Sequence, residues 1–421
     1  MKYYEAQEEL VKAMYDADSE AVYILKPNIF SDEYDNLLKS FKNHYKKTEI
    51  AYSFKTNYVP DLINIVKSKG GYAEVVSIME LELALKVGFK PAQIFFNGPF
   101  KHTQETIEYL RQGVLVNVDS YDEFNWINQV AKKRKITCRI GVRLNFCLNK
   151  DISRFGIDVH NGDVMRILNE VNNTPYLSLE SLHYHYASRD LFKWKECVDA
   201  FLIFMSEIEK DLLRDLRYIS LGGGMFSDMS PYLKKQIANN IPSFIDYAEN
   251  SIEILLPFLN TLNNYLDTDI EVLIEPGTAL AAKSVDFVVK VVSIKSLGGC
   301  TFINTTGSKY NMNPSPNRIN SPTRVVNLSE SSAIDVKNSK LCGYTCIETD
   351  IIHDNFYGRV AKDDLIIFEE VGAYSIVMKP PFILPDVAVL EFDDARGVFK
   401  VRRERQKFGD IFSNFTFFDE L

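Results

Sequence analysis

The chain has few cysteines and no long apolar run. Its 421 residues include only 6 cysteines, too few and too scattered for a disulfide framework. The closest pair, Cys342 and Cys346, is spaced more widely than a CxxC motif and has no second Cys/His pair beside it, so no metal site is expected. Every apolar run is shorter than the ~18 residues that a membrane helix requires.

An excess of basic residues is also absent. Lys plus Arg number 48 against 57 for Asp plus Glu, giving a net charge of −9, so the chain lacks the basic surface that nucleic-acid binding requires. The first ten residues, MKYYEAQEEL, have neither the basic nor the apolar segment of a secretion signal. We therefore expect a reduced cytoplasmic protein that binds neither nucleic acid nor membrane.

Eight short β-rich runs alternate with helical stretches over the first two thirds of the chain. Near-continuous apolar strands separated by helices indicate a parallel sheet, and eight such units predict a (β/α)8 barrel of the TIM type. The runs are residues 49–55, 72–77, 93–98, 114–120, 136–145, 177–188, 218–224 and 270–277.

After residue 277 the pattern changes to strands with few helices between them. We expect strands at residues 285–294, 299–304, 324–327, 340–348, 364–369 and 388–392. The prediction is an α/β fold with two domains. The barrel spans residues 27–279, and an antiparallel β domain combines residues 1–26 with 280–421.

Chemistry-bearing residues stand where the expected barrel strands end, which is where the active sites of such barrels form. They are Lys55 in SFKTN, Glu74 in AEVVS, Arg143 in GVRLN, His185 in HYHYAS and Glu275 in EPGT. A GGG turn at Gly222–Gly224 follows the seventh run, where backbone N–H groups can surround an anion because no Cβ blocks the approach.

Each of these features has a simpler explanation when taken alone. Lys55 would also suit a surface strand end, His185 a hydrogen-bonded core position, and Gly222–Gly224 an ordinary tight turn. Together they offer a Schiff-base lysine, a flat ring, a phosphate nest and a carboxylate for a pyridinium proton, which is what pyridoxal 5'-phosphate requires.

These motifs resemble those of the alanine-racemase-like pyridoxal phosphate enzymes. Within that group the chain is similar to the diaminopimelate/ornithine/arginine decarboxylase family, most of all to its diaminopimelate- and carboxynorspermidine-decarboxylase-like members, from about residue 21 to 375. The resemblance implies that Lys55 forms the Schiff base, that His185 stacks on the cofactor ring and that Glu275 faces the pyridine nitrogen.

The resemblance also implies the remaining site residues. GYTCIETD matches a segment whose Cys and Asp, here Cys346 and Asp350, reach into the partner's site of a homodimer with shared active sites; Cys346 would be catalytic. The other implied cofactor contacts are Glu74, Arg143, Ser188, Gly222, Gly223, Gly224, Gly277 and Tyr374. The implied substrate contacts are Arg154, Thr278, Ile347, Glu348 and Asp350.

Three positions depart from the family pattern. Thr278 stands where an Arg usually follows EPG, Ile347 where a Glu usually follows the catalytic Cys, and Ala187 where HxGS has Gly. Because the cofactor residues match and substrate residues do not, we expect a decarboxylase acting on an amino acid or amino-acid conjugate in a specialised pathway, such as polyamine, siderophore or other natural-product synthesis, rather than in lysine synthesis.

Two alternatives remain open. An amino-acid racemase on the same fold would use Lys55 and a second base without losing carbon, although racemases of this group usually supply Tyr where Cys346 stands. A regulatory or carrier protein that binds pyridoxal phosphate without turnover would need Lys55 but not Cys346.

Overall fold

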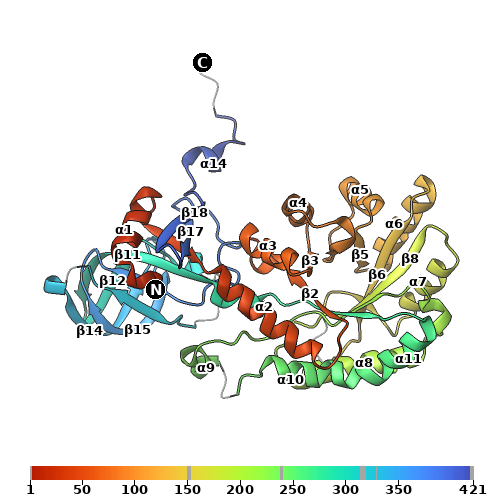
Figure 1. Ribbon diagram of the computed structural model, residues 1–421. Coiled ribbons are helices and arrows are strands. Elements are labelled where there is room, and N and C mark those ends of the chain that lie inside the picture. The colour runs from red at the N-terminus through yellow and green to blue at the C-terminus, as the bar shows by residue number, and fades with distance from the viewer. Residues whose placement is uncertain (1, 149–152, 238–239, 313–318, 329, 418–421) are drawn as a thin grey trace. The chain divides into compact units, whose positions relative to one another are not determined.

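The computed structural model describes residues 2–148, 153–237, 240–312, 319–328 and 330–417 (Figure 1). Its internal contacts divide the chain into two units. The barrel unit comprises Ser31–Asp228 and Ile241–Leu280, and the β unit comprises Met1–Phe30, Met229–Asn240 and Ala281–Leu421.

Eight parallel strands close into a barrel, as the alternation of strands and helices predicts. The hydrogen-bonded order is β2-β3-β4-β5-β6-β8-β9-β10, and β10 pairs back to β2. These strands are β2 Thr48–Ser53, β3 Tyr72–Val75, β4 Ile94–Phe96, β5 Leu115–Val118, β6 Cys138–Asn145, β8 Leu177–His183, β9 Tyr218–Ser220 and β10 Glu271–Ile274, and the short β7 Ile157–Asp158 extends β6.

Helices cover the outside of this barrel, with α3 and α4 on one side and α8 and α11 on the other (Figure 1). They are α2 Pro27–Lys42, α3 Pro60–Ser68, α4 Ile78–Val87, α5 Gln104–Gln112, α6 Tyr121–Arg134, α7 Asp163–Asn172, α8 Leu191–Ser206, α10 Phe244–Ala248, α11 Ile254–Leu266 and α12 Thr278–Ala281. The loops fix where these helices begin. Ser77, Thr103 and Ser120 each accept a bond from a backbone N–H of the first turn of the helix that follows, as N-cap residues do.

Short helical turns connect several of these elements. They are 3-10 helices at Tyr3–Glu5, Phe54–Thr56, Pro91–Gln93, Lys210–Leu213, Ala282–Ser284 and Glu330–Ser332, and a π-helix at Glu249–Glu253.

The β unit contains a nine-stranded sheet and four helices among the described residues. The strands are β1 Ala21–Leu25, β11 Val285–Leu297, β12 Cys300–Thr305, β13 Thr323–Val326, β14 Ile334–Cys342, β15 Ile351–Val360, β16 Leu365–Phe368, β17 Ala388–Asp393 and β18 Val398–Arg403. The helices are α1 Gln7–Asp16, α9 Pro231–Ile237, α13 Lys309–Met312 and α14 Phe408–Phe412.

This sheet is mainly antiparallel, as expected, but β1 runs parallel to β17 and β12 runs parallel to β14. Both parallel pairs are joined by long connections, so no tight hairpin forces them to be antiparallel. The strand expected at residues 340–348 is wrong in its bounds. The chain leaves β14 at Cys342, and β15 follows unpredicted, because half-exposed strands carry a weak hydrophobic alternation.

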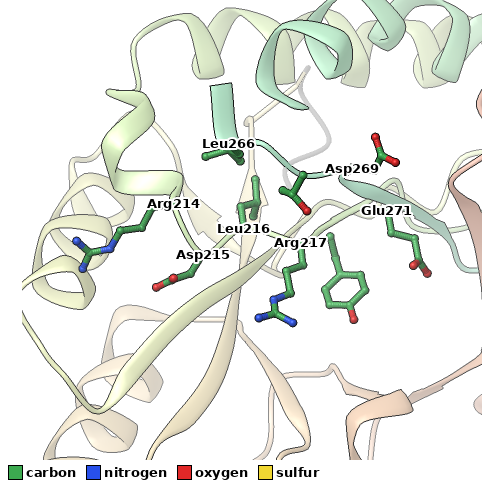
Figure 2. A pocket seen from close by; sticks show the side chains of 9 residues that line it. Arg214, Asp215, Leu216, Arg217, Leu266, Asp269 and Glu271 are labelled. Carbon is green, nitrogen blue, oxygen red and sulfur yellow. The ribbon is translucent and has the colours of Figure 1, made fainter. Parts of the chain in front are cut away.

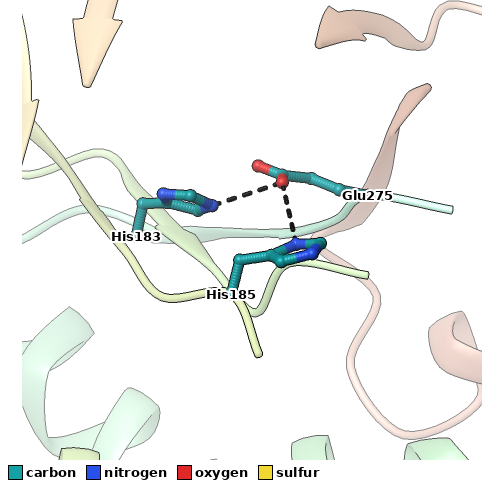
Figure 3. A group of neighbouring side chains, drawn as sticks. All are labelled: His183, His185 and Glu275. Atoms are coloured by element: carbon teal, nitrogen blue, oxygen red, sulfur yellow. Dashed lines mark hydrogen bonds and ion pairs between the residues drawn. The ribbon is translucent and has the colours of Figure 1, made fainter. Parts of the chain in front are cut away.

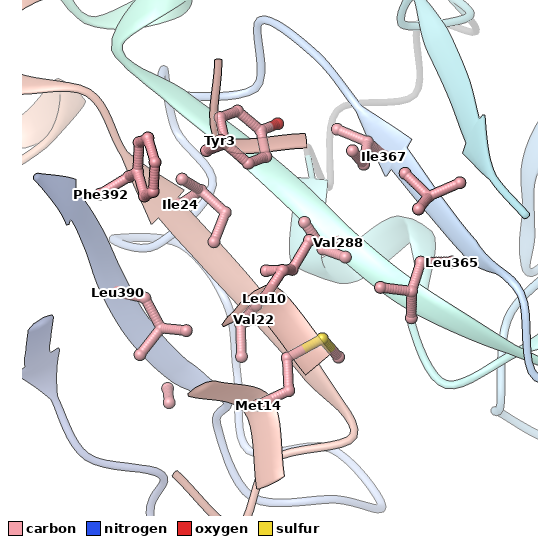
Figure 4. Close-up of a cluster of buried hydrophobic side chains, with 12 residues drawn as sticks. Tyr3, Leu10, Met14, Val22, Ile24, Val288, Leu365, Ile367, Leu390 and Phe392 are labelled. Atoms are coloured by element: carbon pink, nitrogen blue, oxygen red, sulfur yellow. The ribbon is translucent and has the colours of Figure 1, made fainter. Parts of the chain in front are cut away.

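Helix α1 packs its apolar face on the sheet and completes the core of the β unit. Leu10 and Met14 from α1 are buried against Val22, Val288 and Leu390 of three neighbouring strands (Figure 4). Burying aliphatic side chains of this size contributes about 1.5–3 kcal/mol each, so the first residues of the chain belong structurally with its last third.

The inside of the barrel is apolar at its amino end. Tyr72, Phe95 and Tyr218 meet edge to face, with ring centroids 5.0–6.1 Å apart, and pack on Leu115 and Leu273. We call these five side chains the aromatic layer. It closes the barrel interior at the end opposite the candidate site.

A cavity of about 470 Å³ lies near the same amino end, beside the first residues of β9 and β10 (Figure 2). Charged side chains line it, among them Arg214, Arg217, Asp269 and Glu271.

Within the described residues, no helix combines the length and the apolarity that crossing a bilayer demands.

Candidate active site

Lys55 lies at the carboxyl end of the barrel, in the 3-10 turn directly after β2 rather than in the strand itself. Its Nζ lies 2.6 Å from Oε2 of Glu74, and the lysine side chain is 34% exposed while Glu74 is buried. Ser53 Oγ donates to the same carboxylate oxygen. The Glu74 carboxylate therefore holds the partly exposed amine of Lys55 in a fixed position at the carboxyl end of the barrel.

Asn97, which follows β4, connects two carboxylates across the barrel interior. Its Nδ2 lies 3.1 Å from Glu74 Oε1 and 3.3 Å from Glu275 Oε1. Its Oδ1 accepts a 2.7 Å bond from Asn117. Neither asparagine was predicted from the sequence, although each is a polar residue in or directly after an otherwise apolar strand, Asn97 after β4 and Asn117 within β5.

Glu275, directly after β10, is the buried centre of this network (Figure 3). Ser220 Oγ donates to its Oε1 at 2.8 Å, and His183 Nε2 lies 3.2 Å from its Oε2. Burial by itself raises the pKa of Glu275, but the charge and hydrogen bond of His183 outweigh it and hold the pKa well below its usual range. The carboxylate is therefore ionised.

His185 presents a neutral imidazole beside this carboxylate. Its Nδ1 accepts a 2.9 Å bond from the backbone N–H of Gly223, so that nitrogen carries no proton, and its 3.7 Å distance to Glu275 is too long for a hydrogen bond. Burial lowers the pKa of His185. His183, His185 and Glu275 lie close enough for a metal, but the Gly223 amide already occupies Nδ1 of His185, the ring nitrogen that lies 3.7 Å from Glu275.

The glycine turn after β9 is shaped by close contacts. Gly222 and Gly224 have φ of +68° and +102°, which disfavours other residues. A Cβ on Gly223 would lie 2.2 Å from the carbonyl oxygen of Glu275. A Cβ on Gly277 would lie 2.1 Å from Thr56 Oγ1, so this glycine lets the loop after β10 approach the Lys55 turn.

The two predicted arginines sit at the same end of the barrel with different exposure. Arg143 of β6 is buried, with Nη1 3.4 Å from Asp119 Oδ1 and Nη2 3.4 Å from the carbonyl of His185. Arg154 is exposed, and both guanidinium groups stack on Phe155. Arg143 thus orients the His185 segment, and Arg154 remains accessible.

The remaining predicted residues of the barrel unit lie in two of its loops. Ser188 Oγ accepts a 3.3 Å bond from the backbone of Asp190 in the loop before α8. Thr278 begins α12, directly after Gly277. The structure therefore brings together Lys55, Glu74, Arg143, His185, Ser188, Gly222, Gly223, Gly224, Glu275, Gly277 and Thr278 at one end of the barrel.

The other predicted residues lie in the β unit. Cys346 and Glu348 are exposed and Ile347 is half-buried in the loop between β14 and β15. Asp350 is buried, and its oxygens accept bonds from Ser308, Lys309 and Thr345, so it braces this loop. Tyr374 has φ of +58°, a strained conformation for a bulky residue that is often retained at functional sites.

Comparison with known proteins gives consistent matches. A profile of the family described as pyridoxal-dependent decarboxylase, pyridoxal binding domain, matches residues 32–282. Diaminopimelate decarboxylase of Methanocaldococcus jannaschii is 24% identical over 412 residues, covering 93% of this chain and 90% of that protein. The Campylobacter jejuni enzyme of the same name is 25% identical over 405 residues, with 92% and 94% covered.

Solved structures show the same fold. Diaminopimelate decarboxylase from Helicobacter pylori complexed with L-lysine has a TM-score of 0.77 at 22% identity and covers 96% of this chain and 98% of its own. The arginine decarboxylase of Paramecium bursaria Chlorella virus has a TM-score of 0.66 at 18% identity, with 89% and 96% covered.

Proposed function

The chain belongs to the family of pyridoxal-dependent decarboxylases and is a lyase that uses pyridoxal phosphate. From this premise we propose that it releases CO2 from the α-carbon of an amino acid or amino-acid conjugate of a specialised biosynthetic pathway. The observation that carries the proposal is the hydrogen-bonded path from Lys55 through Glu74 and Asn97 to Glu275.

The residues at this end of the barrel fit pyridoxal phosphate. The Gly222–Gly224 turn has no Cβ to block the approach of an anion, although the N–H groups of Gly222 and Gly223 already donate to Ser220 Oγ and His185 Nδ1. Lys55 offers an accessible amine, and Glu275 offers an ionised carboxylate within the same network. Lys55, His185, Glu275 and the glycine turn would hold the cofactor.

When bound, pyridoxal phosphate supplies an electron sink for the pair released as CO2 departs. The protein's own groups set the conditions for this. Glu275 stays negative and so favours a proton on a nitrogen base placed against it. His185 offers a flat, uncharged surface, and Glu74 localises the Lys55 Nζ that carries or returns a proton.

Two positions bear on the substrate. Thr278 offers a hydroxyl without charge, and Ile347 offers no acid for a distal ammonium, although Glu348 stands next to it. A buried ammonium without a partner costs several kcal/mol, so we propose that diaminopimelate, lysine and ornithine are poor substrates. The names of the relatives favour meso-diaminopimelate instead, and this is the competing assignment.

The substrate is tested by measuring CO2 release from a panel of amino acids and their conjugates. We expect larger or less cationic amino acids to perform best. A kcat/KM above about 10⁴ M⁻¹s⁻¹ for meso-diaminopimelate, within the ordinary range of enzymes, would assign the chain to that substrate and end the proposal of a specialised one.

We further propose that the active enzyme is a homodimer in which Cys346 of one subunit acts in the site of the other. Its exposure on the loop that Asp350 braces supports this role. Mixing inactive Lys55→Ala with inactive Cys346→Ala should restore up to about 25% of wild-type activity, since half of the dimers are mixed and each has one complete site. No recovery despite subunit exchange would place Cys346 in its own subunit's site.

A further inference from the structure

A buried ion pair joins a loop and a helix at the carboxyl end of the barrel. Lys101, in the loop after β4, is fully buried, and its Nζ lies 3.1 Å from Oε1 of Glu123 in the first turn of α6, which is also buried. Lys101 also donates to the carbonyl of Gly98 in its own loop. Two charges taken out of water are costly even when they are paired, so the pair needs an explanation.

Capping of helix α6 explains Glu123 but not Lys101. Glu123 Oε2 accepts a 2.8 Å bond from the N–H of Asp119, just before the helix. Glu80 occupies the same position in α4 and accepts a 2.7 Å bond from the N–H of Val76. Within the described residues, Glu80 does this without an ion pair. The start of a helix can therefore be fixed in this fold without a buried lysine.

Asp119 links the ion pair to the residues of the candidate site. Its N–H is held by Glu123, and its Oδ1 lies 3.4 Å from Arg143 Nη1 and accepts a 3.1 Å bond from the N–H of Gly156. The Nη2 of Arg143 lies 3.4 Å from the carbonyl oxygen of His185. Contacts therefore run from the loop after β4 through those after β5 and β6 to the segment after β8.

The charges along these contacts balance. Lys101 and Arg143 are the two cations, and Glu123 and Asp119 are the two carboxylates. Burial lowers the pKa of Lys101, and the charges of Glu123 and Asp119 act against this. Without Lys101, these four residues would keep two carboxylates and one cation. Arg143 would then be attracted more strongly to the carboxylates and away from the carbonyl of His185.

We propose that Lys101 is a positioning residue of the active site. Its ion pair with Glu123 holds Asp119, and Asp119 holds Arg143 where the guanidinium fixes the His185 segment. Lys101 acts only through these contacts and touches neither cofactor nor substrate. The inference rests on the part of the proposed function that places His185 against the cofactor, and it does not depend on which amino acid is decarboxylated.

Cofactor binding to the apoenzyme tests this role without turnover. Lys101→Met removes the cation, and the double variant Lys101→Met/Glu123→Gln also avoids leaving a lone buried carboxylate. We expect both to weaken pyridoxal phosphate binding about 10-fold or more, because a small displacement of a supporting group disturbs a site strongly. The visible circular dichroism of the bound cofactor, which depends on the orientation of its ring, should change as well.

The double variant also separates positioning from packing. If it were as stable as the wild type and had wild-type cofactor affinity and dichroism, the ion pair would serve loop packing alone and the proposal would be overturned.

A double-mutant cycle tests whether the effect passes through Arg143. Arg143→Gln should weaken cofactor binding by a similar or larger factor. Adding Lys101→Met and Glu123→Gln to it should cause little further loss, because the effects of residues in one network are not additive. Factors that multiply in full would mean that the ion pair does not act through Arg143, and this would overturn the proposal.

Lys379 of the β unit provides the matched control. Its side chain is 1% exposed, and its Nζ lies 3.3 Å from Oδ1 of Asp386, so Lys379→Met also removes a buried, paired lysine. We expect the urea midpoint to fall in Lys379→Met while cofactor affinity and dichroism stay at wild-type values. Equal losses of affinity in Lys379→Met and Lys101→Met would show a general effect of destabilisation and would overturn the specific role of Lys101.

His185→Asn separates this inference from the proposed function. Wild-type cofactor dichroism in His185→Asn would contradict the placement of His185 against the cofactor, and with it that part of the proposed function. Altered dichroism in His185→Asn, together with wild-type affinity and dichroism in the Lys101 variants, would overturn the inference alone.

Discussion

The two ends of the barrel are built from the same strands and have opposite character. β3 contributes Tyr72 to the aromatic layer and Glu74 to the site, and β9 contributes Tyr218 and Ser220 in the same way. Residues two apart in a strand share a face. Each of these two strands therefore places an aromatic side chain towards the amino end and a polar one towards the carboxyl end of the same interior.

Open volume does not identify the end that carries the chemistry. The cavity of about 470 Å³ lies at the amino end, where Arg217 is 68% exposed and water can screen its charge. At the carboxyl end, Glu275 is buried and accepts bonds from fixed donors. Desolvated, prearranged charges are what stabilise a reaction's charge development.

The largest expected effect separates two lysines that flank β2. Lys55→Ala should abolish activity and the visible absorption band of the bound cofactor, and borohydride should attach the cofactor to Lys55 in the wild type. Lys47→Ala, before the same strand, removes only a 3.8 Å pair with Asp269 between exposed side chains and should leave both unchanged. Borohydride labelling of another lysine would contradict this location of the site.

The aromatic layer should matter for stability alone. Phe95→Ala leaves a cavity among Tyr72, Tyr218 and Leu273, and such changes cost about 3–5 kcal/mol. Denaturant titration measures this loss, and the kcat of the remaining folded enzyme should be within a few-fold of wild type. A large fall in kcat with unchanged stability would mean that the aromatic layer contributes to catalysis rather than to stability alone.

Two glutamates sharpen the comparison, Glu271 as the first residue of β10 and Glu275 directly after its last. Glu275→Gln removes the negative charge beside His183 and should lower kcat by about 10² or more, with a much smaller effect on cofactor affinity. Glu271→Gln, at the cavity, should leave kcat unchanged. Steady-state kinetics measures kcat for both variants. An equal kcat for Glu275→Gln and wild type would refute the role of Glu275.

The sequence was informative where burial is strong on both faces. The eight apolar runs predicted the barrel because strands of a parallel sheet are covered on both sides. The sequence placed Lys55 correctly at the carboxyl end of the first barrel strand. It predicted, however, that this strand continues to residue 55, whereas β2 ends at Ser53. Whether a strand passes into a 3-10 turn two residues earlier depends on local packing rather than on residue type.

The network inside the barrel could not be predicted because it depends on register. Asn97 joins Glu74 to Glu275 only because β3 and β4 pair as Glu74 with Phe95, and one polar residue at a strand end gives no sign of its partners.

The smallest expected effect concerns Glu80, an acid of the carboxyl end that stabilises a loop. Its Oε2 accepts a 2.7 Å bond from Val76 N–H, and its own N–H donates to Ser77. Burial, partly offset by the Val76 bond, raises the pKa of Glu80 from 4.5 to about 7. Between these values the folded chain holds a proton that the unfolded chain has lost, so stability falls as pH rises.

The stabilisation associated with this proton is therefore complete below about pH 4.5 and lost as pH rises through about 7, and it amounts to at most about 3 kcal/mol. Glu80→Gln removes the titration and should flatten the decline in the urea midpoint between pH 5 and 8. Glu82→Gln, on the exposed side of the same helix, is the matched control and should keep the wild-type slope. If Glu80→Gln keeps that slope as well, the carboxyl is ionised in the fold and its bonds to the loop do not depend on pH in this range.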